Sequence, residues 1–436
     1  MRKIVRSTWR ILPTAWRTAF WLWFEKTVRP HIVSTHGFTP LKSNSRRFSR
    51  GDYDSGENRA DRQLVVAGLF RSASGIGEAA RGTYRSLRAA GLSPIAVDIT
   101  EGLTPADYQT DILLERIESK EAGTLILHVN APETLHALEA IGLISKDRRA
   151  NKRRQWRVIG YWAWELTTLP KLWRRRFRCV SEIWTLSDFT AEAFRAAKGA
   201  PAVSAIPIAV EPPPQAFASS ILPGPRPTGP NKPTVFLTMA DANSSIARKN
   251  PVAAIKAFRT AFEDASEHRL IVKTRNLAGN EVAAQLLREA IGDAPNISLI
   301  DAPYTEEERW SLLATADVLI SLHRAEGFGL PCAEAMSLGK TVIATGYSGN
   351  LFFMDETCAA LVPYQLVPVE DPTRIYGGEG QQWAEPDIGA AADIMRRLAI
   401  DEKAREALGA AAKTRIAELC SPVAVGARMA RLLKAV

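Results

Sequence analysis

Cysteine and histidine are scarce in this 436-residue chain, and neither occurs in a metal-binding pattern. The six histidines show no H-x-x-x-H spacing, and no C-x-x-C pair is present. The four cysteines lie far apart, at Cys179, Cys332, Cys358 and Cys420. This pattern argues against a disulfide framework and a structural zinc site. It predicts a reducing compartment and no metal ion.

The chain also lacks long apolar runs, and beyond residue 60 it lacks a strong net charge. No run of about 18 uncharged apolar residues occurs, so no segment is expected to span a membrane. The net charge is +9, but eight of these charges lie in residues 1–60, and the rest of the chain is close to neutral. A near-neutral body argues against a basic groove for nucleic acid.

The N-terminal segment combines basic charge with an aromatic face. Residues 1–30 hold four of the eleven tryptophans, and at helical spacing the apolar side chains share one face flanked by arginines. This pattern predicts a helix in a membrane interface, on the cytoplasmic side. Docking on the protein's own body is the alternative. Arg10 and Arg17 interrupt the apolar stretch that a signal peptide would need.

Beyond residue 60, short apolar runs alternate with helical patterns, which predicts an α/β protein with two doubly wound, Rossmann-like domains. Eight prolines in residues 211–233 indicate a linker between them. The expected units are a basic aromatic segment with a flexible connector (1–60), a first domain (61–210), the linker (211–233), a second domain (234–400) and helices that return toward the first domain (401–436). Two such domains place a ligand cleft between the carboxyl ends of their sheets.

Individual elements can also be assigned from the pattern. Strands are expected at 63–70, 93–99, 124–130, 156–162, 182–187 and 202–208, and then at 234–240, 269–274, 296–301, 317–322 and 341–346. Helices are expected at 77–91, 250–262, 280–291, 306–316 and 331–338, and they dominate after about residue 387.

The stretch EGFGLPCAE (326–334) follows an expected strand and opens a helix, with Pro331 suited to the first helical turn. The amides before that helix favour a phosphate or diphosphate because they are unpaired and the helix dipole points at them. These amides belong to Gly327, Phe328, Gly329 and Leu330. Glu326 and Glu334 flank the loop. Carboxylates beside a phosphate are tolerated where each accepts hydrogen bonds from hydroxyl groups, as a sugar and a ribose would supply.

These residues resemble the retaining glycosyltransferases of family 4, which have the GT-B fold. Glu326 and Glu334 match the family's E-x7-E signature, with GFGL after the first glutamate. The stretch 240–262 is similar to the family's donor-binding segment and puts Lys249 at its diphosphate-binding lysine, next to Arg248. Segments 159–194, 347–354 and 383–387 resemble one bacterial branch, of the polysaccharide type. The resemblance covers about residues 62–400.

The resemblance implies a role for each matched residue. Glu326 would contact hydroxyl groups of the donor sugar, and Glu334 would bind the ribose diol of the nucleotide. Lys249 and Arg248 would neutralise the diphosphate leaving group, and such charge stabilisation is usually the largest catalytic contribution. The resemblance also implies retention of configuration by front-face attack, without an enzyme nucleophile, a cofactor or a metal ion.

Three further candidates lie at the carboxyl ends of strands in the second domain. Lys273 and Tyr304 could line the donor site, and Asn350 follows the strand after the glycine loop. Each of them could equally serve the packing of the domain. His128 ends a strand of the first domain, where a structural role is favoured.

The first domain would be the acceptor side. Gly75 and Gly77, in RSASGIGEAAR, lie where the family has a glycine-rich loop near acceptor and phosphate. Many members carry a histidine after the strand that here is 156–162, whereas this chain has aromatic residues and Glu165. A catalytic role and a polar position at the rim are both open for Glu165.

The predicted activity is transfer of a sugar from a nucleotide-sugar donor to a hydroxyl group of a membrane-proximal glycan or lipid-linked acceptor, in cell-surface polysaccharide synthesis. The enzyme would sit on the inner face of the membrane through residues 1–30. Two alternatives stay open: an epimerase with the GT-B fold, and a catalytically silent, membrane-associated sugar-binding protein. The base, the sugar and the acceptor are not specified by the sequence.

Overall fold

The structure is a computed structural model, and it describes residues 63–117, 122–144, 156–213, 233–262, 267–372, 375–378 and 380–434. The expected N-terminal segment and nearly all of the expected linker lie outside the described residues. Gln63–Pro372 and Tyr376–Val436 form one compact unit, which contains two six-stranded parallel sheets.

The first sheet has the strand order β2-β1-β3-β4-β5-β6, and all neighbours are parallel. Val65, Val66 and Ala67 in β1 are fully buried, because helices cover both faces of the sheet. The strands are β1 (Gln63–Gly68), β2 (Ile95–Asp98), β3 (Gly123–His128), β4 (Trp156–Tyr161), β5 (Glu182–Thr185) and β6 (Ala202–Ala205).

The second sheet has the order β12-β11-β10-β7-β8-β9, also with parallel neighbours. Its strands are β7 (Val235–Asp241), β8 (Arg269–Arg275), β9 (Ile297–Asp301), β10 (Val318–Ser321), β11 (Thr341–Thr345) and β12 (Ala360–Val362). β7 and β10 are neighbours although β8 and β9 intervene in the chain, so the winding direction reverses between them. Ligands bind at such a switch point, outside the carboxyl ends of the strands.

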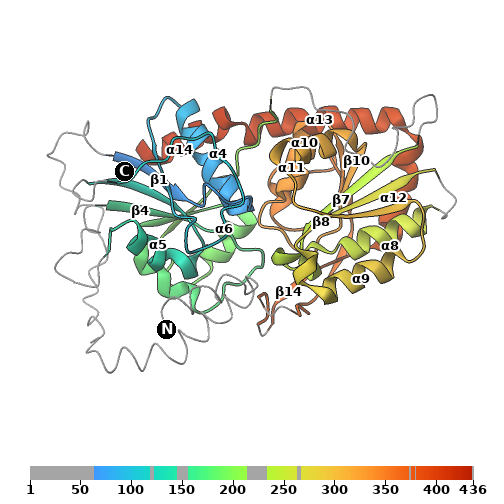
Figure 1. Ribbon diagram of the computed structural model, residues 1–436, viewed down its shortest axis with the longest axis horizontal. Helices are drawn as coiled ribbons and strands as arrows, with labels where there is room; N and C mark the ends of the chain where they lie inside the picture. Colours follow the sequence, from blue (N-terminus) through green and yellow to red (C-terminus); the bar gives the residue numbers. More distant parts are fainter. Residues whose placement is uncertain are drawn as a thin grey trace. The chain divides into compact units, whose positions relative to one another are not determined.

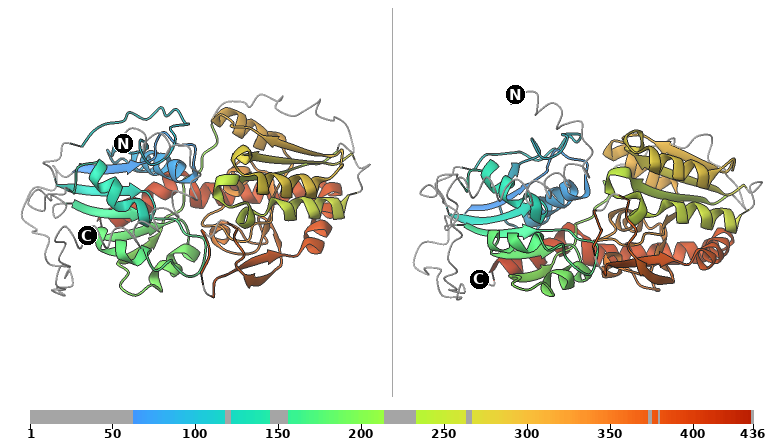
Figure 2. Two further views of the ribbon diagram at one scale, coloured as in Figure 1. Left: turned by 60° about the horizontal axis from the view of Figure 1, so that its bottom comes forward. Right: turned by 90° about the horizontal axis from the view of Figure 1, so that it is seen from below.

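Helices pack on both faces of each sheet (Figures 1 and 2). Apolar residues of α8, α9 and α12 form one core with the second sheet, and those of α10, α11 and α13 pack on its other side. The helices are α4 (Gly75–Ala89), α5 (Thr134–Ala140), α6 (Asp188–Arg195), α7 (Ile246–Lys249), α8 (Pro251–Ala261), α9 (Glu281–Ile291), α10 (Glu306–Thr315), α11 (Leu330–Ser337), α12 (Ile388–Ile400), α13 (Glu402–Cys420) and α14 (Pro422–Lys434). Short 3-10 turns are η3 (Ala131–Glu133), η6 (Trp173–Cys179), η7 (Ala242–Ser244), η8 (Leu277–Gly279) and η9 (Gly349–Phe352).

Every strand and helix range predicted above is present, with ends that differ by at most three residues. The sequence pattern missed the helices α5, α6 and α7, the strand β12 and an antiparallel pair, β13 (Tyr364–Pro368) with β14 (Gln382–Pro386). β13 is mostly exposed, so it lacks the buried apolar run that marks the other strands. The pair, together with residues 369–372, 376–378 and 380–381, is called the β13–β14 arm below.

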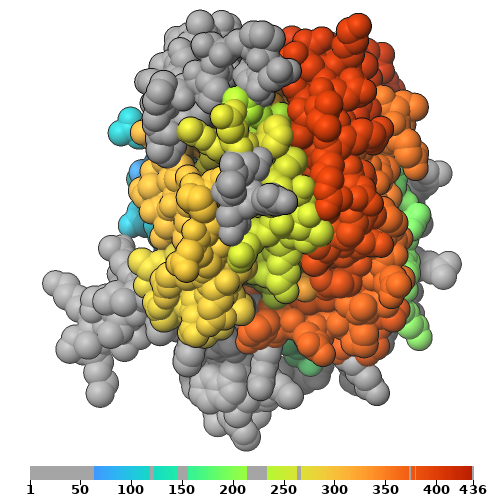
Figure 3. All heavy atoms as spheres, turned by 90° about the vertical axis from the view of Figure 1, so that its right-hand side faces the viewer, coloured from blue at the N-terminus to red at the C-terminus, as the bar shows by residue number. Residues whose placement is uncertain are grey.

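The C-terminal helices connect the two domains. α13 contacts α11 and β11 of the second domain, whereas α14 packs along α4 of the first. At the bend between these helices, the Val210 amide donates to the Cys420 carbonyl at 2.8 Å. A space-filling view shows α9, α8 and α12 as adjacent bands on one face of the second domain (Figure 3).

None of the described helices is both long and apolar enough to cross a bilayer.

Candidate active site

The glycine loop between β10 and α11, residues 326–329, forms the centre of the site. Gly329 precedes α11 with φ +91°, a left-handed conformation that favours glycine. Pro331 lies in the first turn of the helix. Among the described residues, no hydrogen-bond acceptor satisfies the backbone amides of Gly327, Phe328, Gly329 and Leu330. Four free amides at a helix N-terminus are suited to an anion.

A second turn packs against this loop. The Gly349 amide donates to the Glu326 carbonyl at 2.8 Å, and a Cβ on Gly349 would lie 2.1 Å from the Gly327 carbonyl oxygen. The Ser348 hydroxyl accepts from the Glu326 amide at 2.8 Å. Because the two backbones touch, this contact restrains the glycine loop and the backbone that carries the Glu326 side chain.

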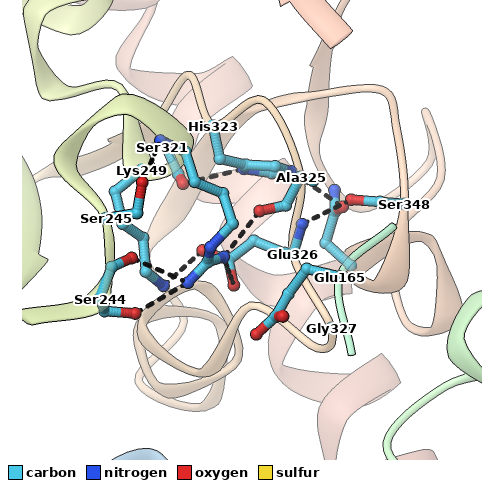
Figure 4. Close-up of polar contacts among 12 residues, drawn as sticks. Glu165, Ser244, Ser245, Lys249, Ser321, His323, Ala325, Glu326, Gly327 and Ser348 are labelled. Atoms are coloured by element: carbon cyan, nitrogen blue, oxygen red, sulfur yellow. Dashed lines mark hydrogen bonds and ion pairs between the residues drawn. The ribbon is translucent and has the colours of Figure 1, made fainter. Parts of the chain in front are cut away.

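Two cations from α7 hold the Glu326 carboxylate (Figure 4). Lys249 Nζ lies 2.5 Å from Glu326 Oε1, and Arg248 Nη1 lies 3.2 Å from Glu326 Oε2. The Arg248 guanidinium also donates to the Ala325 carbonyl at 2.7 Å and to the Ser244 hydroxyl at 2.8 Å. Arg248 and Glu326 are 2% and 6% exposed, so this ion pair is nearly dry, and a buried charge of this kind needs a partner.

Neighbouring charges determine the pKa of Glu326 and of Arg248. Burial by itself would raise the pKa of Glu326, but the charges of Lys249 and Arg248 outweigh it, and its pKa is lowered to about 2. Burial alone would lower the pKa of Arg248, and the neighbouring Tyr376, Glu326 and Glu165 raise it instead. At neutral pH, Glu326 is therefore ionised and Arg248 is protonated beside it.

The backbone around α7 is unusual, and it delivers the two cations. Ser245 (φ +59°) and Asn250 (φ +51°) flank the single turn that carries Arg248 and Lys249, both in the left-handed region. Residues other than glycine rarely adopt this region, and such strain gathers at functional sites. The Ser245 hydroxyl donates to Asp371 Oδ1 at 3.1 Å, which ties this turn to the β13–β14 arm.

Glu334 lies on α11, and its partner is one that the sequence pattern did not identify. Arg309 of α10 forms an ion pair with Glu334 through Oε1. Glu334 is 3% exposed, and burial raises its pKa to about 7, with Glu78 and Glu306 raising it further and Arg309 opposing the rise. No motif marks Arg309, because only the packing of α10 against α11 brings the two side chains together.

The first domain reaches the site through the loop after β4. The Tyr376 hydroxyl, from the β13–β14 arm, donates to Glu165 Oε2 at 3.0 Å, and the Arg248 guanidinium lies 5.5 Å from the Tyr376 ring centroid. The Ser187 hydroxyl, before α6, donates to the Gly327 carbonyl at 2.8 Å. Glu165 thus lies beside the glycine loop, and Figure 4 draws no contact between it and Glu326.

Gly75 and Gly77, at the start of α4 in the first domain, differ in the space around them. A Cβ on Gly77 would lie 2.3 Å from the Ser72 carbonyl oxygen, so glycine is needed there for the turn that starts α4. A Cβ on Gly75 would meet nothing within 4 Å. The turn alone explains Gly77, and the space around Gly75 is open.

Lys273 and Tyr304 contact each other but not the Lys249–Glu326 cluster. Lys273 Nζ donates to the carbonyls of Thr274 at 2.7 Å and Ala302 at 2.6 Å, and it lies 4.2 Å from the Tyr304 ring centroid. Burial lowers the pKa of Lys273 to about 8. Among the described residues, no hydrogen bond or ion pair links this pair to Glu326, so the two form a separate group at the end of β8 and β9.

Asn350 and His128 are both fully buried. Asn350 Nδ2 donates to the Thr345 carbonyl at 3.1 Å, and its Oδ1 lies 3.1 Å from His323 Nε2, so it supports the glycine loop from inside. His128 stacks on the Tyr161 ring at 4.3 Å, and burial lowers its pKa to about 3. Within the described part of the chain, no three or more His, Cys, Asp or Glu side chains are grouped so that they could hold a metal ion.

Solved structures share this fold at low sequence identity. Anabaena HepE, solved in complex with UDP and glucose, matches with a TM-score of 0.58 and 14% identity, over 86% of this chain and 100% of that one. Sucrose-phosphate synthase from Thermosynechococcus elongatus matches with a TM-score of 0.57 and 16% identity, over 86% and 99%. S. aureus TarM, in complex with fondaparinux, alpha-GlcNAc-glycerol and UDP, matches with a TM-score of 0.50 and 12% identity, over 71% of this chain and 55% of that one. The fold is therefore GT-B.

The sequence comparison agrees with the fold. No curated protein sequence matches the chain. Residues 186–418, more than half of the chain, match the family described as "Family 4 Glycosyltransferase in conflict systems". This span contains the glycine loop, both glutamates of the E-x7-E signature and the Arg248–Lys249 turn. The chain belongs to the family 4 glycosyltransferases.

Proposed function

We propose that this glycosyltransferase is a retaining hexosyltransferase that uses a nucleotide-sugar donor without a metal ion. The observation that carries the proposal is the position of Lys249 and Arg248 on Glu326, beside four free amides at the N-terminus of α11. A diphosphate placed on these amides would have two cations next to it. Those cations supply the charge neutralisation that a bound metal ion supplies in other transferases.

The roles of the two glutamates follow from their charge. Glu326 stays ionised, so it can only accept hydrogen bonds, and hydroxyl groups of the donor sugar are suitable donors. Glu334, on the other side of the loop, would accept from the ribose diol. HepE and TarM, which share the fold, were solved with UDP, and we therefore propose UDP as the nucleotide here.

The acceptor in this proposal is a hydroxyl group of a membrane-proximal glycan or lipid-linked sugar, as in cell-surface polysaccharide synthesis. Its support is the basic, aromatic character of residues 1–30. Deletion of those residues is expected to abolish sedimentation with vesicles that contain anionic lipid. Sedimentation that is unchanged by the deletion would contradict the membrane assignment.

Calorimetric titration with UDP, GDP and ADP in the presence of a chelator tests the donor proposal directly. We expect UDP to bind without metal, and the corresponding UDP-sugar to be turned over with retention of the anomeric configuration, as followed by NMR. Absence of binding by all three nucleotides would overturn the proposed function. Turnover that requires an added divalent ion would overturn the metal-independent part.

A further inference from the structure

Arg309 contacts the E-x7-E signature but belongs neither to that signature nor to the turn that carries Lys249. It lies on α10, a quarter of its side chain is exposed, and it pairs with Glu334, whose side chain is 3% exposed. The closest approach of Arg309 is to Glu334 Oε1, and no side-chain hydrogen bond from a described residue is donated to Oε2. Oε2 can therefore accept a hydrogen bond from a hydroxyl group.

The charges around Glu334 come from three elements. Arg309 and Glu306 lie on α10, and Glu78 lies in the first turn of α4, in the facing domain. Glu306 in turn accepts a hydrogen bond from the Tyr108 hydroxyl of the first domain. Two nearby carboxylates disfavour ionisation of Glu334, and Arg309 is the cation that opposes them.

Arg81 lies in the first domain, beside the Tyr108–Glu306 contact that joins the two domains. Its guanidinium lies 3.7 Å from the centroid of the Tyr108 ring and pairs with Glu78 at 2.8 Å. Arg81 is 1% exposed and donates to the carbonyls of Phe70 and Ser72, both at 2.9 Å. Arg81 therefore contacts both Glu78 and Tyr108, and Tyr108 in turn holds Glu306 of α10.

We propose that Arg309 is a positioning residue for nucleotide binding: its guanidinium holds one oxygen of Glu334, so that the other oxygen accepts from the ribose diol. This inference rests on the proposed function. Without Arg309, the buried carboxyl group faces only Glu78 and Glu306 and takes up a proton more readily. Recognition of the diol then weakens at neutral pH.

The experiment compares the affinity for UDP with that for 2′,3′-dideoxy-UDP, between pH 6 and 9, in the full-length protein. The affinity ratio reports the diol alone, because ionisation of the diphosphate is common to both ligands. In the wild type we expect the preference for UDP to grow as the pH rises through about 7, the pKa of Glu334. In Arg309→Met this rise is expected to move upward by about one pH unit, with about a fivefold loss of preference at pH 7.

Matched variants separate positioning from loss of folding. Arg309→Lys keeps the charge and is expected to restore most of the preference, and Glu306→Gln should move the rise to lower pH, opposite to Arg309→Met. Arg288→Met, which removes an exposed arginine of α9, is expected to leave the ratio unchanged. Should Arg309→Met fail to fold, the pH profiles of Glu306→Gln and Arg309→Lys still test whether Arg309 positions Glu334.

The outcomes distinguish the two proposals. A wild-type protein that binds UDP, together with an Arg309→Met variant that keeps the wild-type ratio at every pH, would overturn the role of Arg309. Equal affinity of the wild type for UDP and its dideoxy analogue would overturn it as well. A wild type that binds no nucleotide would instead overturn the proposed function itself.

Discussion

At the scale of single residues, Glu326 illustrates how burial and pairing set a charge. A buried carboxylate without a partner would be protonated, whereas contact with Lys249 and Arg248 lowers the pKa of this one to about 2. Under the proposed function, the same two cations would face the oxygens of a bound diphosphate.

Lys249→Met tests the catalytic contribution of this charge. Loss of one donor aimed at a developing negative charge typically costs about 100-fold or more in turnover, and we expect a loss of that size here. Steady-state rates with the UDP-sugar are the measurement, and Lys256→Met, which removes an exposed lysine of α8, is the control. A Lys249→Met variant with the rate of the Lys256→Met control would contradict the assignment.

Glu326→Gln tests the stability that the ion cluster contributes. Because the folded-state pKa lies below the ordinary value of 4.5, the stabilisation is complete above that value and is lost as the pH falls toward about 2. A lowering of this size corresponds to about 3 kcal/mol. The free energy of unfolding of wild type and variant, measured in urea at several pH values, should differ at pH 7 and converge near pH 2. A difference that stays constant with pH would argue against the ionised pair.

At the scale of elements, the glycine loop and the turn after β11 act as one unit. Gly349 lies against the Gly327 carbonyl, and both turns connect a strand of the second sheet to the helix or 3-10 turn that follows it. The GFGL motif predicted the loop because glycine and proline act locally. The contact with residue 349 depends on the parallel register of β10 and β11.

Gly349→Ala is expected to displace the glycine loop. A Cβ 2.1 Å from a backbone oxygen cannot be relieved by a side-chain rotation, so the variant should lose about 2 kcal/mol of stability and most of its nucleotide affinity. Thermal unfolding and UDP titration measure the two effects. Gly279→Ala is the control, since a Cβ there meets nothing within 4 Å. Equal behaviour of the two variants would show that the loops are not in contact.

At the scale of the whole molecule, α14 joins the end of the chain to the first domain. A Cβ on Gly426 would lie 2.0 Å from the Ser86 carbonyl of α4, so the two helices touch at their backbones. Arg157 of β4, paired with Glu182, donates to the Leu432 carbonyl at 3.2 Å. Both contacts tie the last helix to the first domain.

Gly426→Leu should separate α14 from α4. We expect faster hydrogen exchange in residues 75–89 and a lower unfolding temperature, because a leucine cannot fit where the backbones touch. Ala427→Leu, at an exposed position of the same helix, is expected to behave like the wild type. Exchange rates in α4 that are the same in both variants would contradict this packing.

The sequence by itself determined the alternation of strands and helices, the two-domain α/β fold and the glycine loop with its two glutamates. These features follow from local rules, namely apolar periodicity, glycine and proline chemistry, and a spacing of eight residues along one segment. Exposed β13 escaped prediction because it carries no buried apolar run. Tertiary structure alone decided that Lys249 and Arg248 contact Glu326 across 77 and 78 positions of sequence, and that Arg309 pairs with Glu334. Such pairings depend on which helices and strands become neighbours, and no local pattern in the chain records that choice.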